Sequence, residues 1–169
     1  TFLIASAATL SNITIGPVIP NHLESVLETL KATGSKIIIK GNEITIKTKE
    51  IKAVNIKTAP FPGFPTDLQA PFTALMAIAK GNSEISETIY ENRMGHVDLL
   101  NSMGASIQLV NNIAKIQGVD ELKGQNLKGS DLRSTAALII AALSAKDTSY
   151  IGGLEHLDRG YDCFESKLN

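Results

Sequence analysis

The sequence contains little cysteine, few aromatic residues and almost no net charge, and each shortage argues against a class of protein. Of its 169 residues, one is cysteine, none is tryptophan and 5% are aromatic. Cys163 alone cannot form an internal disulfide, and the three scattered histidines form no cluster at metal-ligand spacing. A formal net charge of −1 provides no basic stripe. We therefore expect no metal site and no nucleic-acid partner.

Common ligand-binding signatures are also missing. The chain has no GxxxxGK(S/T) phosphate loop, no GxGxxG after a strand and no GxSxG. Nucleotide hydrolysis, a Rossmann-type cofactor and serine hydrolase chemistry are thus without local support, and we expect no cofactor.

Long apolar runs are absent too. None approaches the roughly 20 residues that a membrane span requires, so we expect no membrane partner. The apolar start, residues 1–8, has no basic stretch before it and is typical of a buried helix rather than a signal peptide. Together with the single cysteine, this favours a reducing, cytosolic setting.

What is present is a regular alternation of helical and strand patterns. Period-two alternation is clearest around residues 37–39 and 43–46, and Gly41-Asn42 between them marks a hairpin turn. The patterns predict helices over 1–9, 21–33, 67–80, 93–103, 131–145 and 158–169. They predict strands over 12–16, 35–40, 43–48, 53–58, 82–87, 105–110, 113–117 and 148–152.

This order repeats. Gly34 and Gly104 occupy the same place, each closing the second helix of a unit. We expect one domain over residues 1–169, made of units at about 1–50, 51–118 and 119–169, with both ends incomplete. The third unit stops before its hairpin.

The first helix of each unit is apolar on every side, most plainly over residues 136–143, whereas the second helices carry one apolar stripe. A helix without a polar face must be covered all round. We therefore expect an α/β fold in which buried helices are surrounded by small sheets.

The same pattern at the start of a predicted helix occurs twice, as Thr66-Asp67-Leu68-Gln69 and Ser130-Asp131-Leu132-Arg133. In both, a hydroxyl residue stands at the N-cap position and an aspartate follows in the first turn. If the buried helices point their N-termini to one end, their dipoles converge there and favour a shared anion site. The alternative is that Asp67 and Asp131 only complement the dipoles, which is worth about 0.3–1 kcal/mol each. For Asp131, Arg133 offers a further local partner.

Three arginines, Arg93, Arg133 and Arg159, are placed at or just inside predicted helix N-termini, where a cation opposes the dipole. A bound phosphate or carboxylate would explain this placement through charge-assisted hydrogen bonds. Surface pairing with Glu91, Asp131 or Asp158 is the alternative. Cys163 falls on the predicted last helix and is expected to be a packing residue.

Taken together, four segments resemble the UDP-N-acetylglucosamine 1-carboxyvinyltransferase family, in the family's order and spacing. They are Ala59 to Ala70, Glu87 to Arg93, Ser130 to Arg133 and His156 to Tyr161. The resemblance implies an inside-out α/β barrel of βαβαββ units. It also implies transfer of enolpyruvate from phosphoenolpyruvate to the 3-hydroxyl of UDP-N-acetylglucosamine with release of phosphate. In the family, this is the first committed step of peptidoglycan synthesis, in the bacterial cytoplasm.

The resemblance also implies roles for six residues. Asp67 matches the carboxylate beside the reacting hydroxyl, and Arg93, Arg133 and Arg159 match basic residues around phosphoenolpyruvate. Ile89 matches a position touching the nucleotide-sugar, and Asp131 would orient nearby cationic groups.

The resemblance implies that the family's loop with a Cys or Asp general acid, and its Lys-Asn pair, belong to a second domain, and we expect neither among these 169 residues. Cys163 does not match the loop cysteine, and Phe61 stands where some members carry His. We therefore expect the 169 residues to fold but not to turn over. Two alternatives remain: the related 3-phosphoshikimate 1-carboxyvinyltransferase, which shares fold and donor, and a non-catalytic anion-binding module.

Overall fold

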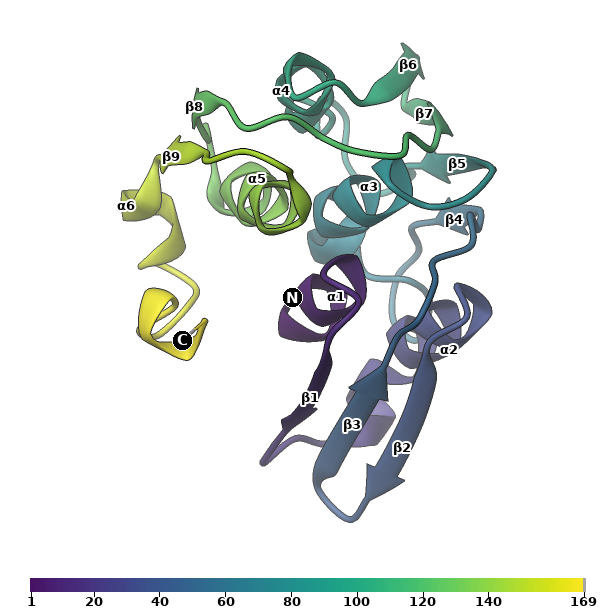
Figure 1. Ribbon diagram of the computed structural model, residues 1–169. Coiled ribbons are helices and arrows are strands. Elements are labelled where there is room, and N and C mark those ends of the chain that lie inside the picture. The colour runs from purple at the N-terminus through teal and green to yellow at the C-terminus, as the bar shows by residue number, and fades with distance from the viewer. Residues whose placement is uncertain (169) are drawn as a thin grey trace.

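The computed structural model describes residues 1–168, and three apolar helices lie together at its centre (Figure 1). They are α1 (Phe2–Ala8), α3 (Gln69–Ala77) and α5 (Leu132–Ser144), and each contacts the other two. All nine residues of α3 are buried. Central helices that are covered on every side were expected from their lack of a polar face. This is confirmed for α3, and for α5 except near its C-terminal end, where Leu143 is 44% exposed.

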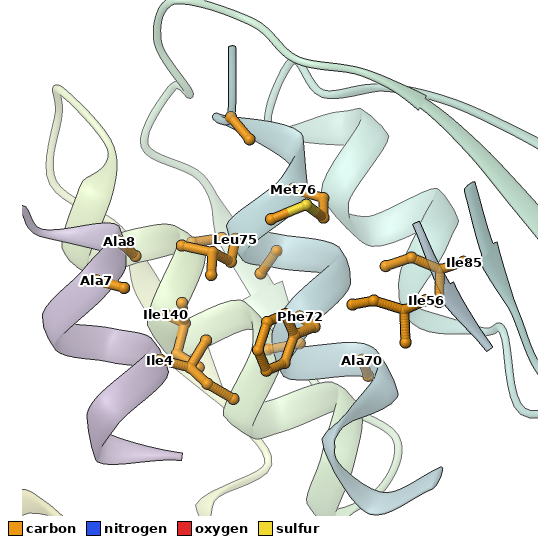
Figure 2. Packing of buried hydrophobic residues seen from close by; sticks show 14 of the residues in the cluster. Ile4, Ala7, Ala8, Ile56, Ala70, Phe72, Leu75, Met76, Ile85 and Ile140 are labelled. Atoms are coloured by element: carbon orange, nitrogen blue, oxygen red, sulfur yellow. The ribbon is translucent and has the colours of Figure 1, made fainter. Parts of the chain in front are cut away.

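Large and small side chains alternate where these helices meet. Ile4 of α1, Phe72 of α3 and Ile140 of α5 point toward one another in the core (Figure 2). Ala7 and Ala137 are completely buried, and their small side chains let the helix backbones approach closely. The core is therefore made by helix-to-helix packing rather than by sheet-to-sheet packing.

Three small sheets cover the central helices from outside (Figure 1). Their strand orders are β1-β3-β2, β4-β5-β7-β6 and β8-β9. The strands are β1 (Asn12–Ile15), β2 (Lys36–Lys40), β3 (Glu43–Lys47), β4 (Ile56–Lys57), β5 (Asn82–Ser86), β6 (Ser106–Val110), β7 (Ile113–Gln117), β8 (Asn126–Lys128) and β9 (Tyr150–Gly152). The inside-out α/β arrangement is thus confirmed, although within residues 1–168 the sheets stay separate and do not close into a barrel.

The strand pairing of the first and third sheets repeats parts of the pairing in the second sheet. β4 pairs in parallel with β5, and β8 pairs in parallel with β9. The antiparallel order β5-β7-β6 matches β1-β3-β2. The run from β4 to β7 therefore has the order βαβαββ.

The outer helices, α2 (Glu24–Ala32) and α4 (His96–Ser102), each bury one stripe. Both end as predicted, at Gly34 with φ +101° and Gly104 with φ +94°. The N–H groups of Ser35 and Ala105 reach back to the carbonyls of Leu30 and Leu100, the six-to-one bond of a Schellman motif. A left-handed residue is required at this point, and glycine adopts it without a Cβ clash.

Some element bounds differ from the predictions. The strand expected over 53–58 is only two residues long as β4, and β8 was not predicted at all. Both are short parallel strands, whose pairing depends on partners distant in sequence. The described residues also form three short 3-10 helices, η1 (Pro20–Leu23), η2 (Thr66–Leu68) and η3 (Glu165–Lys167). No helix in residues 1–168 combines the length and apolar character needed to cross a membrane.

The helix predicted over 158–169 is wrong for the described residues. Helix α6 (Leu154–Leu157) ends where that helix was expected to begin, and Cys163 interrupts the following segment with φ +48°. The apolar stripe that suggested a helix does pack inward: Phe164 stacks on Phe2 with ring centroids 5.1 Å apart, and Tyr161 meets Phe164 edge-on. Packing against the central helices thus overrides the helical period.

Truncation of Phe72 tests the helix-centred core. Phe72 is completely buried, so we expect Phe72→Ala to lower the free energy of unfolding by about 3–5 kcal/mol, measured by urea denaturation. Phe61→Ala is the matched control, because that ring is 76% exposed and should change stability by less than about 0.5 kcal/mol. Equal effects of the two substitutions would contradict a core centred on α3.

Candidate active site at the converging helix ends

The N-terminal ends of the three central helices meet at one end of the molecule. Asp67, in η2 just before α3, contacts Arg133 in the first turn of α5. Thr1, directly before α1, is hydrogen-bonded to the hydroxyl of Tyr161. The pKa of Tyr161 is raised, by burial first and then by the nearby charge of Asp67. The predicted convergence of helix ends is confirmed.

Asp67 is held by two arginines through one of its two oxygens. Its Oδ1 accepts from Arg133 Nε at 2.7 Å and lies 2.7 Å from Arg133 Nη2. Arg93 Nη1 approaches the same oxygen at 3.3 Å. The second oxygen, Oδ2, has no hydrogen-bond partner among the described residues, and the Asp67 side chain is 67% exposed. The site thus offers a free carboxylate oxygen flanked by two cations.

Arg93 reaches Asp67 from a turn, not from a helix start. The predicted helix over 93–103 begins only at His96, so Arg93 does not oppose a helix dipole as expected. Asn92 turns the backbone with φ 56°, a left-handed value that asparagine tolerates. The guanidinium then stacks over the Tyr90 ring, with Cζ 3.8 Å from the ring centroid. This stacking fixes the plane of the guanidinium.

Arg93 also donates from Nη1 to the Thr66 hydroxyl at 2.9 Å. Thr66 was expected to be an N-cap, but its side chain caps nothing and instead donates to Glu87 Oε2 at 2.7 Å. Its hydroxyl joins a buried carboxylate to an arginine of the site.

Glu87 is a site residue to which the sequence reasoning gave no role. It directly follows β5, is 3% exposed and accepts hydrogen bonds from two threonines and two backbone N–H groups. Burial alone would raise its pKa, but the bonds from Thr66, the Ile89 and Tyr90 N–H groups and Thr58 together lower it. The residue is therefore a buried carboxylate held ionised. A glutamate immediately after a buried strand is the signal that could have found it.

Asp131 is the N-cap of α5, the place that had been expected for Ser130. Its Oδ1 accepts from the backbone N–H of Arg133 at 2.8 Å and of Ser134 at 3.1 Å. The Ser134 hydroxyl accepts from the Asp131 N–H in return, completing a capping box. Burial raises the pKa of Asp131, but these bonds outweigh it and lower the pKa overall. The pairing of Asp131 with the Arg133 side chain, which was the alternative to a functional role, does not occur; that side chain contacts Asp67.

The other two predicted site residues are Ile89 and Arg159, and of these only Ile89 shares a segment with the cluster. Ile89 is 36% exposed on the same turn as Arg93. Arg159 is exposed just after α6 and makes no ion pair or side-chain hydrogen bond within residues 1–168, so the structure does not bring it to Asp67. Tyr161, two residues later, does reach the cluster. Cys163 is exposed rather than packed, because the expected helix is absent.

His96 lies behind the site, at the start of α4. It is 2% exposed, and its Nε2 atom is buried without a hydrogen-bond partner. Burial lowers the pKa of His96 to about 4, with the charge of Asp131 opposing the shift. At neutral pH the ring is therefore uncharged.

Chemically, the cluster can bind an anion at the arginines and accept a proton or hydrogen bond at Asp67 Oδ2. Within residues 1–168, no three His, Cys, Asp or Glu side chains gather in a way that could hold a metal ion.

Comparison with known proteins assigns the family. The sequence matches the EPSP synthase (3-phosphoshikimate 1-carboxyvinyltransferase) family over residues 1–168. The chain belongs to this family. A solved structure of EPSP synthase from Acinetobacter baumannii shares the fold. The TM-score is 0.66 at 16% identity, over 96% of this chain and 42% of that one.

Two other proteins are more similar to this chain than that EPSP synthase is. A relative from Prochlorococcus marinus subsp. pastoris, named UDP-N-acetylglucosamine 1-carboxyvinyltransferase, is 72% identical over all of this chain and 37% of its own length. The enolpyruvyl transferase NikO from Streptomyces tendae has a TM-score of 0.84 at 25% identity, over 94% of this chain and 38% of that one. The resemblance found in the four sequence segments is confirmed. The chain spans little more than a third of the length of the curated relative.

The Asp131 cap can be tested by two substitutions. Asp131→Ala removes the acceptor for two N–H groups, so we expect a loss of about 1 kcal/mol in the free energy of unfolding, measured by urea denaturation. Asp131→Asn keeps an acceptor oxygen and should retain most of the stability. Asp120→Ala, at an exposed position outside helices and strands, is the control. The cap assignment fails if Asn is as damaging as Ala.

His96 predicts a pH dependence of stability. Because its folded pKa of about 4 lies below the unfolded value of 6.5, its contribution is complete above pH 6.5. As the pH falls from 6.5 to 4, the unfolded chain takes up the proton first, and about 3 kcal/mol of stability is lost. Urea unfolding at pH 7, 5.5 and 4 measures the loss. His96→Gln should remove this slope, whereas His22→Gln, at an exposed ring, should not; parallel curves for wild type and His96→Gln would contradict the assignment.

Proposed function

We propose that this chain forms part of an enzyme that transfers enolpyruvate from phosphoenolpyruvate to the 3-hydroxyl of UDP-N-acetylglucosamine and releases phosphate. The observation that carries the proposal is the Asp67 carboxylate, held between Arg93 and Arg133 with one oxygen left free. It is supported by 72% identity to a relative named UDP-N-acetylglucosamine 1-carboxyvinyltransferase. The proposal places the reaction in the bacterial cytoplasm, at the first committed step of peptidoglycan synthesis.

Asp67 is the candidate base or orienting group. Its free Oδ2 can accept the hydrogen of the sugar 3-hydroxyl while the hydroxyl oxygen attacks C2 of phosphoenolpyruvate. C3 of phosphoenolpyruvate gains a proton, which gives a tetrahedral phospho-ketal. This intermediate then loses a proton from C3 as it expels phosphate, and the C2–C3 double bond is restored. Because Arg93 and Arg133 occupy only Oδ1, they orient the carboxylate and leave its proton-accepting oxygen open.

The two arginines are the candidate anion ligands. A guanidinium carries five N–H donors, so each arginine can contact Asp67 and still bind a phosphate or carboxylate. Asp131, by capping α5, fixes the helix turn from which Arg133 projects, and so orients that cation indirectly. Ile89 is proposed to pack against the nucleotide-sugar, and the exposed Arg159 to join the phosphoenolpyruvate site when ligands bind.

Further groups are proposed to come from a second domain. The 72% identical relative is far longer than this chain, which covers 37% of it. The general acid that protonates C3 and part of the nucleotide-sugar site are proposed to lie in such additional sequence, facing the converging helix ends.

A second acceptor, shikimate 3-phosphate, is favoured by one observation only: the matched family is described as 3-phosphoshikimate 1-carboxyvinyltransferase. The solved EPSP synthase is 16% identical to this chain, against 72% for the relative named for the nucleotide-sugar. We therefore propose UDP-N-acetylglucosamine as the acceptor.

Phosphate release tests both acceptors. The assay uses a full-length chimera in which these 169 residues replace the matching segment of the Prochlorococcus marinus relative. With phosphoenolpyruvate present, we expect release with UDP-N-acetylglucosamine and none with shikimate 3-phosphate. Asp67→Ala should lower kcat by at least about 100-fold because it removes the proton acceptor, whereas Asp120→Ala should have no effect. Release with shikimate 3-phosphate alone would overturn the proposed acceptor.

A further inference from the structure

Glu87 is buried at 3% exposure, keeps its charge, and lies one hydroxyl away from a site arginine. The proposed chemistry does not use it. Ionised carboxylates are seldom buried unless they are fully hydrogen-bonded, because removing a charge from water is costly. We propose that Glu87 is a positioning residue: it sets the direction of Arg93 through the Thr66 hydroxyl and holds the turn that carries Ile89. This role rests on the proposed function.

The two carboxylate oxygens of Glu87 accept hydrogen bonds from different groups. Oε1 accepts from the backbone N–H groups of Ile89 at 2.8 Å and Tyr90 at 3.1 Å, and from the Thr58 hydroxyl at 2.9 Å. Oε2 accepts from the Thr66 hydroxyl at 2.7 Å. One oxygen therefore fixes the backbone of the turn, and the other acts on a side chain of the site.

The Thr66 hydroxyl has a single hydrogen, and this makes the link directional. A carboxylate can only accept, so Thr66 must give its hydrogen to Glu87. A lone pair of Thr66 then faces Arg93 Nη1, which donates to it at 2.9 Å. The negative charge of Glu87 thus strengthens the acceptor that Arg93 binds, and hydrogen bonds in such a chain polarise one another.

The turn provides a second route to the same arginine. Glu87 holds the Tyr90 N–H, and the Tyr90 ring lies beneath the Arg93 guanidinium at 3.8 Å from its centroid. Glu87 therefore fixes Arg93 from two sides, through Thr66 at its Nη1 atom and through Tyr90 at its face. Ile89, whose N–H is also bound, is fixed by the same oxygen.

Glu87→Gln separates the two functions. Three donors converge on Oε1 and only one on Oε2, so the amide oxygen should replace Oε1 and the amide nitrogen should face Thr66. The backbone bonds then survive, but the Thr66 hydrogen loses its acceptor and its hydroxyl is no longer forced to face Arg93 with a lone pair. Glu87→Ala removes both functions.

Kinetics in the full-length chimera test the role. We expect Glu87→Gln to lower kcat about tenfold while the KM for UDP-N-acetylglucosamine changes less than about twofold. Glu87→Ala should lower kcat similarly and also raise that KM about tenfold, because the turn bearing Ile89 is released. Glu84→Gln, the same change at an exposed position on β5, should alter neither constant. If Glu87→Gln behaves like Glu84→Gln, the role is refuted.

A double-mutant cycle tests the route through Thr66. Thr66→Val keeps the side-chain shape, removes the hydroxyl, and should lower kcat about tenfold. In the Thr66→Val background, Glu87→Gln should lower kcat by less than a further twofold, because the link is already broken. If the two effects instead multiply to about 100-fold, Glu87 does not act through Thr66.

Amide hydrogen exchange does not depend on turnover, so it tests the positioning role of Glu87 separately from the proposed function. In the 169-residue chain, the Ile89 and Tyr90 amide protons should exchange with solvent at least about tenfold faster in Glu87→Ala than in Glu84→Ala, measured by NMR. Lack of phosphate release by the wild-type chimera would refute the proposed function, and the exchange rates would still test the positioning role. Unchanged exchange in Glu87→Ala would refute the positioning role alone.

Discussion

The constraint on which the whole structure depends is that three helices have no polar face. A helix such as α3, buried along its entire length, cannot lie on a surface, so other elements must cover it from every side. The three helices cover one another on their inner sides, and small sheets together with the outer helices α4 and α6 cover most of the remainder (Figure 1). The usual order of an α/β fold, with the sheet inside and the helices outside, is thereby reversed.

This reversal also determines where polar chemistry can occur. The sides of the central helices are occupied by apolar packing, so charged groups gather at their ends. Because the N-termini share one end, Asp67 and Arg133 meet although they are 66 residues apart in sequence. The unpaired N–H groups of the helix ends add partial positive charge in the same place. The gathering of charged groups at this end is thus a consequence of how the core is packed.

The helices, turns and helix ends that depend only on neighbouring residues could be predicted from the sequence. The buried helices, the hairpin at Gly41-Asn42 and the glycine ends at Gly34 and Gly104 all depend on neighbouring residues, and all were found. The segment after Asp158 failed because its apolar residues follow the surface of the central helices rather than a helical period.

The candidate site was predictable as a set of residues but not as a set of contacts. Two aspartates and three arginines stood out by their charge and position, yet which arginine meets which carboxylate depends on the three-dimensional arrangement. Thr66 was predicted to be a cap and Glu87 was given no role, since their hydrogen bond joins residues 21 positions apart.

The hydrogen bond between Thr1 and Tyr161 joins residues 160 positions apart, and it forms where the first and last units meet. Closing a loop of this length costs conformational entropy, which the packing of α1, α3 and α5 against one another offsets. The end of the molecule that carries the site therefore holds residues from all three units, and it is complete only when all three are packed together.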